Sequence, residues 1–383
     1  MTSSPLALDS QFEAIDVETG INKGMPKFVQ DQQGSISPYE FLPAWVFYTP
    51  VVLQSFALAL RYGDVRLPLV ANPSIKLSGM VGESKHDILS LAGSYARQWV
   101  SPFITVFQTG EDVAEQSSKA YQQMRDNGLD FPIVAKPDLG CRGAGVKLLH
   151  NMDQLTQYFE SFPKDSRFLL QEKAPYPAEA GVFYVRYPGE KKGKVISLTL
   201  KYAPFVEGDG QSTLKELIEA DPRAGQLTHL YFPRHQSKLD QVLQKGESFQ
   251  LAFAGSHSRG SIFRNGNAYI SERLTEQLDR IFDDVEGFCY GRLDIKFQDI
   301  YELMDGKNFT ILEINGASSE AAHIWDRKTP LREIFSTLLF QYRTLFAIGA
   351  LQKKAGHKPP SISQLLAAWR EEKQLVNAYP QTD

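Results

Sequence analysis

The fold prediction depends on two segments, YGRLDIKF at 290–297 and NFTILEIN at 308–315. Both alternate in period 2, which is the pattern of a strand whose side chains point to opposite faces of a sheet. The short linker between them suits antiparallel neighbours. In that pairing Asp294 lies beside Glu313 and Asn315. We therefore expect a polar cluster on one face of a largely apolar sheet.

The side chains of this cluster are typical metal ligands. Two carboxylates and an amide oxygen are hard ligands that suit Mg²⁺ or Mn²⁺. Magnesium retains several waters and commonly binds phosphate oxygens, so the set Asp294, Glu313 and Asn315 indicates a nucleotide site. The alternative is a solvated sheet face neutralised by Arg292 or Lys296. Unpaired charge is costly beside apolar strands, which favours the metal site.

A lysine and a glycine loop stand earlier, in FPIVAKPDLGCRGAGVKLL at 131–149. Lys136 ends an apolar strand, and Gly143 and Gly145 follow in the loop. Glycines let backbone amides approach phosphate oxygens, and a lysine adds a positive charge. A strand follows the loop, so the pattern is neither a P-loop nor a dinucleotide-binding motif, and an ordinary hairpin turn is the alternative. Cys141 has no histidine in its sequence context to support a role as nucleophile.

The stretch FLLQEKAPYPAE at 168–179 is expected to be a strand that runs out into Glu172, Lys173 and Ala174. Main-chain groups there could bind the edge of an adenine. Glu179, seven residues after Glu172, could accept hydrogen bonds from ribose hydroxyls. The alternative is an edge strand that simply leaves a sheet.

Further cations stand in two later segments. Lys201, in LTLKYAPF, could reach a phosphate from a facing sheet, or could be an exposed strand lysine. The segment GSHSRGS at 255–261 offers His257, Arg259 and backbone amides for a carboxylate or an acyl phosphate. An ordinary polar loop is the alternative.

These pieces, in this order, resemble the ATP-grasp superfamily, which includes D-alanine–D-alanine ligase, glutathione synthetase, cyanophycin synthetase and the RimK-type ligases. VEGDGQSTLKELI is especially similar to the cyanophycin synthetase type. The resemblance implies an α+β and α/β chain with the ATP-grasp fold: two α+β lobes that grip ATP, preceded by an α/β pre-ATP-grasp domain. The matched motifs, within about residues 131–316, are IVAKP with its glycine loop, LLQEKA followed by Glu179, GDGQSTLKELI, GRLDIKF and ILEING.

The resemblance also implies roles for individual residues. Arg292 is expected to help hold a phosphorylated intermediate, with Lys201 and Arg259 as further catalytic groups. Lys85 occupies the place of an early phosphate-binding lysine, although a surface helix lysine fits its surroundings equally well. The implied ligands are Lys136, Gly143 and Gly145 for the phosphates, Glu172, Lys173 and Ala174 for adenine, Glu179 for ribose, and Asp294, Glu313 and Asn315 for magnesium.

The implied activity is ATP-dependent ligation. A carboxylate would be activated as an acyl phosphate and joined to an amine, with Mg²⁺ or Mn²⁺ required. A small-molecule kinase and a non-catalytic nucleotide-binding module are the alternatives. After ILEIN the sequence GASSEAAHIWD departs from the dipeptide ligases, which puts D-alanine as acceptor in doubt. Glu320 and His323 could shape a different acceptor site, or serve only in capping and packing.

The chain has 383 residues, enough for two or three structural units at roughly 100–200 residues each. Local patterns predict a strand at 65–73 and an Asn-Gly hairpin at 259–271. The expected units are an N-terminal arm at 1–40, the pre-ATP-grasp domain at 41–110, a first lobe at 111–193, a second lobe with the metal site at 194–330, and C-terminal helices at 331–383.

Composition limits the partners. With 41 Lys and Arg against 45 Asp and Glu, the net charge is −4, so nucleic acid is not an expected partner. Two cysteines cannot form a disulfide framework, and the N-terminus lacks a secretory pattern, so a cytoplasmic location is expected. The uncharged run 44–60 is short for a span of about 20 residues and contains Pro50, so a buried helix is expected instead of a membrane or interfacial one. The apolar stretch 337–351 should pack on the core or form a homodimer.

Overall fold

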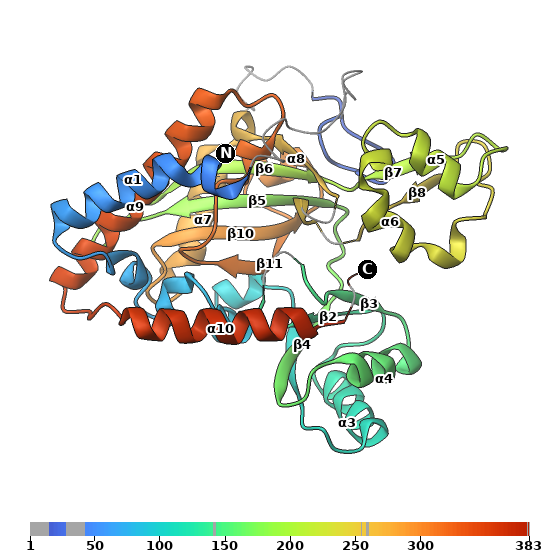
Figure 1. Cartoon of the computed structure of the whole chain (residues 1–383), viewed down its shortest axis with the longest axis horizontal. Coiled ribbons are helices and arrows are strands. Elements are labelled where there is room, and N and C mark those ends of the chain that lie inside the picture. The colour runs from blue at the N-terminus through green and yellow to red at the C-terminus, as the bar shows by residue number, and fades with distance from the viewer. Residues whose placement is uncertain are drawn as a thin grey trace, which may run out of the picture.

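The computed structural model of the chain describes residues 15–27, 43–140, 143–253, 255–257, 260–380 and 382. Two antiparallel sheets, each with its own helices, form a large and a small lobe (Figure 1). The strand orders are β11-β10-β5-β6-β9 in the large lobe and β1-β4-β2-β3 in the small one, and a two-stranded sheet pairs β7 with β8. The predicted two-lobe α+β architecture is therefore confirmed.

The small lobe has a compact core between its sheet and two helices. Leu155 and Phe159 of its second helix pack against Phe168 of the sheet, and all three are fully buried. The predicted strands and helices of this part are present with shifts of a few residues at their ends. The elements are β1 (Phe103–Gln108), α3 (Val113–Asp126), β2 (Ile133–Pro137), β3 (Lys147–Leu149), α4 (Met152–Ser161) and β4 (Ser166–Glu172).

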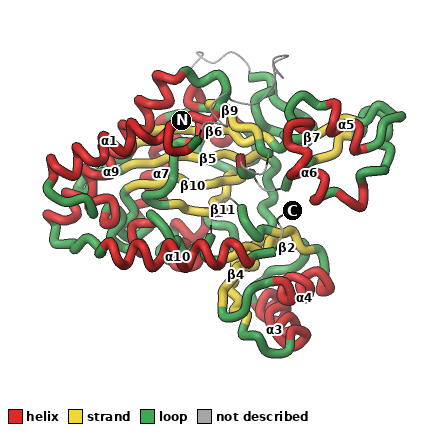
Figure 2. Tube along the Cα trace, in the orientation of Figure 1, coloured by secondary structure: helices red, strands yellow, loops and turns green. Residues whose placement is uncertain are grey.

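The large lobe is built on its five-stranded sheet, whose central strand β5 is buried at every position. The amphipathic helix α7 places Leu274, Leu278 and Ile281 in the core at helical spacing. Figure 2 shows the strands side by side with helices around them. The elements are β5 (Ala178–Val185), β6 (Lys194–Tyr202), β9 (Ile262–Asn265), α7 (Glu272–Asp283), β10 (Tyr290–Phe297), α8 (Ile300–Met304) and β11 (Phe309–Asn315).

A small subdomain projects from the large lobe between β6 and β9 (Figure 1). Its first helix starts in the GDGQSTLKELI motif, where Thr213 and Glu216 form a reciprocal capping box. It has its own hydrophobic core, to which Leu214, Ile218 and Tyr231 belong. The elements are β7 (Phe205–Glu207), α5 (Leu214–Ala220), α6 (Thr228–Arg234) and β8 (Ser248–Gln250).

Helices from both ends of the chain complete the large lobe. α1 (Ala44–Tyr62) packs against α9 (Leu331–Lys354), and the short α2 (Lys85–Leu89) lies near β11. α10 (Ile362–Ala378) runs past the large sheet to the small lobe (Figure 1). Among the described residues, α9 is the one helix whose length and apolar composition would allow it to span a bilayer. In this structure it packs against α1.

The region expected to form a separate α/β domain at 41–110 differs from the prediction. The strand expected at 65–73 is wrong, since Leu67–Val70 is a 3₁₀ helix. Pro68 lies in this turn and cannot donate to a sheet ladder. The strand β1 pairs with β4 of the small lobe. The described part of 41–110 therefore contributes its single strand to a lobe and has no sheet of its own.

Two further predictions are corrected by strand pairing. β5 lies in the large sheet between β10 and β6, although residues 178–185 were expected in the first lobe. The hairpin expected at 259–271 is wrong, because β9 pairs with β6 and a 3₁₀ helix, Asn267–Tyr269, follows. Gly266 has a φ of −104° and forms no hairpin turn, and the hydrogen bonds of β9 go to a strand about 60 residues earlier.

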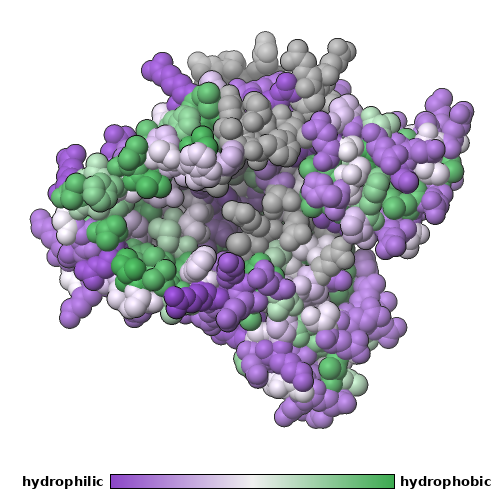
Figure 3. Space-filling view, viewed as in Figure 1, coloured by the Kyte–Doolittle hydropathy of each residue, from purple (hydrophilic) through white to green (hydrophobic). Residues whose placement is uncertain are grey.

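Helix α1 is buried on one face only, whereas its uncharged sequence predicts a fully buried helix. Its inner face is buried, with Phe47 and Val51 among the core residues. Its outer face exposes Trp45, Leu53 and Phe56 by 76%, 66% and 67%. Figure 3 shows hydrophobic surface over this side of the molecule. The expectation of a fully buried helix is therefore wrong.

Candidate active site

Strands β10 and β11 bring the predicted ligand residues together. Their register places Asp294 opposite Glu313 and Arg292 opposite Asn315, with a bulge directly after Asp294. All four line a cleft of about 1160 Å³, which takes its walls from both lobes and the small subdomain. In Figure 3 a hollow with hydrophilic residues lies at the centre of this face.

Asp294 is the centre of an ionic cluster. Its Oδ1 lies 2.9 Å from Lys201 Nζ and 3.0 Å from Arg292 Nε. Burial opposes ionisation of Asp294, but Arg292 and Lys201 outweigh it and lower its pKa to about 2. The carboxylate is therefore charged at every ordinary pH. Lys201 is buried in this cluster, so its interpretation as an exposed strand lysine is wrong.

Glu313 lies close to a lysine that sequence reasoning could not place. Lys85 Nζ is 3.4 Å from Glu313 Oε1 and donates to the carbonyl oxygen of Gly140 at 3.0 Å. Burial opposes the charge of Lys85, but Glu313, Glu83 and Asp138 outweigh it and raise its pKa. Lys85 is thus a buried ammonium that joins the glycine loop to the acidic strand, and a surface helix lysine is excluded.

Lys136 reaches the large lobe from the end of β2. Its Nζ donates to the carbonyl oxygen of Leu312 at 2.8 Å, and it lines the cleft. Burial lowers the pKa of Lys136 to about 8. The amide of Gln171, on the neighbouring strand, donates to the same carbonyl at 3.3 Å. Two polar side chains of the small lobe therefore meet the acidic strand directly.

The two candidate glycines of the loop have different surroundings: one lines the cleft, and the other contacts the C-terminal segment. Gly143 lines the cleft, whereas Gly145 does not. The Gly145 N–H donates to Thr382 Oγ1 at 3.0 Å, and a Cβ at this position, where φ is +71°, would lie 2.7 Å from Pro137 Cγ. The expected phosphate contact from Gly145 therefore does not fit this arrangement. Cys141 lies outside the described residues.

The residues at the end of β4 line the same cleft, as expected for an adenine edge. Glu172 is the last residue of the strand, and Lys173 and Ala174 follow it. Val134, Val146, Leu148 and Leu312 also line the cleft, and they come from both lobes. An apolar slot bordered by main-chain groups suits a flat heterocycle.

Glu179, which is expected to bind a ribose, is already paired with two lysines. Its two carboxylate oxygens lie 3.3 Å from Lys201 Nζ and 3.2 Å from Lys296 Nζ. It lines the cleft but is almost fully buried in this pairing. A ribose hydroxyl would therefore share Glu179 with two lysines. Sequence reasoning had assigned Lys296 only a neutralising role.

The remaining candidates are partly outside the site. Arg259 lies outside the described residues, and His257 lines the cleft. His323 is buried against Ser197, 2.6 Å from its Oγ, and burial lowers the pKa of His323 to about 4, so packing is its role. The carbonyl oxygen of Glu320 accepts from Arg292 at 3.3 Å.

Two cleft residues were missed. Glu83 accepts a hydrogen bond from the Gly316 N–H, and burial raises its pKa to about 8. Glu372 of α10 accepts from the Gly82 N–H at 2.6 Å. Both partners are separated from the acids by more than 200 residues in sequence, and local patterns carry no signal for such pairs.

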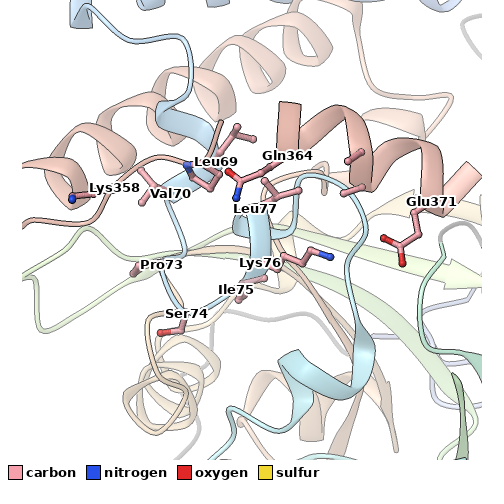
Figure 4. Close-up of a pocket in the computed structure, with 13 residues that line it drawn as sticks. Leu69, Val70, Pro73, Ser74, Ile75, Lys76, Leu77, Lys358, Gln364 and Glu371 are labelled. Carbon is pink, nitrogen blue, oxygen red and sulfur yellow. The ribbon is translucent and has the colours of Figure 1, made fainter. Parts of the chain in front are cut away.

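A second hollow, of about 450 Å³, lies between the segment around Leu69–Leu77 and α10 (Figure 4). It shares no lining residue with the cleft. Gln364 and Glu371 reach it from α10. None of the predicted site residues contributes to it, so the cleft is the candidate site.

The acids of the cleft suit a magnesium ion that is completed by other ligands. Among the described residues, no three His, Cys, Asp or Glu side chains form a self-sufficient metal site. Asp294, Glu313 and Asn315 supply two carboxylates and an amide, and Asn315 Nδ2 is buried without a hydrogen-bond partner. An amide can be turned to present its oxygen there. The set thus fits an ion that draws its remaining ligands from water and phosphate.

Comparison with known proteins gives a consistent result. The chain is 25% identical over 213 residues to the cyanophycin synthetase of Synechocystis sp. and 23% identical over 220 residues to that of Geminocystis herdmanii. Each match covers 51% of this chain and 24% of the relative. The chain thus spans about a quarter of the length of these relatives. No profile of a known protein family matches it.

Solved structures with a similar arrangement include the D-alanine–D-alanine ligase of Bacillus anthracis, at 13% identity and a TM-score of 0.39, with 79% of this chain and 72% of that chain covered. The ATP-grasp ligase PsnB gives 13% identity and a TM-score of 0.34, with 68% and 60% covered. This chain resembles ATP-grasp ligases.

Proposed function

We propose that the protein is an ATP-dependent ligase that activates a carboxylate as an acyl phosphate and joins it to an amine. One observation carries this proposal: cations of the small lobe and acids of the large lobe converge on one cleft. Lys136 of β2 contacts the backbone of β11 at 2.8 Å, directly beside Glu313. A triphosphate with its counter-ion needs this combination of ammonium groups and hard oxygen ligands.

The nucleotide would lie between the lobes. Its base would occupy the apolar slot beside Glu172, Lys173 and Ala174, and its phosphates would extend toward Lys136 and the acids. Asp294, Glu313 and Asn315 would hold a magnesium or manganese ion, which when bound neutralises phosphate charge.

The reaction would then proceed in two displacements. A carboxylate oxygen of the first substrate attacks the γ-phosphorus, the bond to the β-phosphate oxygen breaks, and ADP leaves. The amine of the second substrate attacks the carbonyl carbon, the bond to the phosphate oxygen breaks, and the amine loses a proton. Arg292 and Lys201, which the ion pairs with Asp294 hold in place, would stabilise the negative charge that develops on these oxygens. Such chemistry depends on positioning and charge and needs no covalent protein nucleophile.

The test is release of ADP and phosphate from ATP and Mg²⁺, with a panel of carboxylates crossed with amino acids and polyamines. We expect turnover to require both a carboxylate and an amine. Glu313→Gln should lower turnover at least about 100-fold, since removal of a group that stabilises transition-state charge has effects of this size. Glu276→Gln, an exposed carboxylate paired with Lys192, is the matched control.

Two results would contradict the proposed ligase activity and favour another function. Accumulation of a phosphorylated first substrate, with no response to any amine, would indicate a kinase. Nucleotide binding with every activity unchanged in Glu313→Gln would indicate a binding module without catalysis.

A further inference from the structure

Four aromatic rings from distant parts of the sequence form a continuous row along the cleft. Phe47 of α1 stacks on Trp325, with centroids 5.2 Å apart and an interplanar angle of 23°. The ring of His257 lies 6.1 Å from that of Trp325 and 5.0 Å from that of Phe263. All four residues line the cleft, but Phe47 and Phe263 are almost fully buried, so Trp325 and His257 are the accessible members of the set. We call this set the aromatic row.

One end of the aromatic row lies beside the proposed reacting centre. Phe263 of β9 is directly opposite Lys201 of β6, and Lys201 Nζ lies 6.0 Å from the Phe263 ring centroid. Lys201 in turn contacts Asp294 at 2.9 Å. A group bound to the row is thus about one side chain away from the charges that would stabilise the acyl phosphate.

The row is held rigidly from behind. Asp326, which follows Trp325, pairs with Arg264 at 3.2 Å and accepts from the Asn265 N–H at 2.7 Å. Phe47 is backed by Phe335 of α9, with centroids 5.8 Å apart. These contacts fix two members of the row to the edge strand and to α9, so the surface is preformed.

We propose that one of the two substrates carries an aromatic or comparably large apolar side chain, and that the aromatic row selects it. The inference rests on the proposed ligase function and adds the substrate class. The accessible aromatic surface of Trp325 and His257 gains by contact with another apolar group and offers little to a small polar substrate. A preformed apolar surface rejects a substrate that lacks the matching group because the water on the rings is then not displaced.

Matched substrate pairs test the class. The pairs are L-phenylalanine with L-alanine, phenylacetate with acetate, and phenethylamine with ethylamine, each crossed with the carboxylate and amine panels in the ADP-release assay. We expect the ring-bearing member of at least one pair to be used with a kcat/KM at least about tenfold higher, a lower limit since one methylene can give this factor. The pair that responds identifies whether the carboxylate or the amine carries the ring. Equal kcat/KM within every pair would overturn the inference.

Variants of the aromatic row test whether it is responsible for the substrate preference. Trp325→Leu and, independently, Phe263→Leu should raise the KM for the ring-bearing substrate at least about tenfold with little change for its ring-free partner. Phe340→Leu is the control, because Phe340 is exposed on α9 and does not line the cleft. Loss of preference in Phe340→Leu would contradict the assignment, as would unchanged preference in both row variants.

A binding measurement separates this inference from the proposed function. Calorimetry with protein loaded with a non-hydrolysable ATP analogue measures L-phenylalanine and phenylacetate against L-alanine and acetate, without turnover. Binding of a ring-bearing compound that is weakened by Trp325→Leu supports the row even if no ADP is ever released. ADP release with ring-free substrates only would leave the ligase function intact and overturn the row.

Discussion

At the scale of single residues, the pKa of Lys136 predicts how nucleotide affinity depends on pH. Burial lowers its pKa to about 8, so its ammonium group is charged below that pH and neutral above it. The affinity for an ATP analogue should fall as pH rises through 8 and beyond, by about 10–100-fold in total, the range of a lost charged hydrogen bond. Calorimetric titrations from pH 7 to 10 measure this.

The control for this effect is a lysine far from the cleft. Lys119→Met removes an exposed ammonium group on α3 that pairs with Glu115, and it should keep the wild-type profile. Lys136→Arg should flatten the profile, since a guanidinium stays charged throughout. A wild-type affinity independent of pH over this range would show that Lys136 does not contact the phosphates.

Asp294 should matter for stability as well as for catalysis. In Asp294→Asn the cations of Lys201 and Arg292 lose a buried counter-charge. We expect the free energy of unfolding to fall by about 3 kcal/mol, the usual cost of breaking a buried pair. Urea denaturation measures it. Asp305→Asn, whose partners Arg273 and Lys307 are largely exposed, should cost less than about 1 kcal/mol. Equal costs for the two variants would mean that the Asp294 cluster is effectively solvated.

At the scale of elements, α10 ties the two lobes together. Tyr379, just after the helix, stacks on Phe162 of the small lobe at 5.3 Å, and its hydroxyl donates to the Leu139 carbonyl at 2.7 Å. Tyr379→Ala should lower stability by about 3 kcal/mol, typical of removing a packed ring, and should weaken nucleotide binding by loosening the glycine loop. Trp369→Ala, half-exposed on the same helix, should leave nucleotide affinity unchanged. Thermal melts with and without the nucleotide analogue distinguish these outcomes, and unchanged affinity in Tyr379→Ala would exclude the coupling.

Elements with a strong local period could be predicted from the sequence. The alternation in 290–297 and 308–315 predicts the β10–β11 register, and the structure confirms Asp294 opposite Glu313. The hairpin at 259–271 is wrong because β9 finds its partner in β6, and a local turn signal cannot report a distant ladder. The uncharged run at 44–60 correctly predicts a helix, α1, but composition alone does not predict that only one face of this helix is buried.

At the scale of the whole molecule, the site depends on contacts across the chain. The site residues that the motifs predict do converge on one cleft, including Lys136 and Glu313 from different lobes. Among those that the structure describes, Gly145 is the exception, because its amide binds Thr382, 237 residues away. Lys85 and Glu83 could not be assigned for the same reason. Motif order indicated which segments meet, whereas the partners of each polar group became clear only from the fold.

The most direct test of the central claim is calorimetric binding of a non-hydrolysable ATP analogue with Mg²⁺ to variants from each side of the cleft. Lys136→Ala removes the small-lobe cation, and Glu313→Gln removes a large-lobe acid. The account predicts one site per chain in the wild type, with affinity lowered at least about tenfold by each change, as expected for the loss of a charged contact. Wild-type affinity in both variants, or no binding to the wild type, would contradict it.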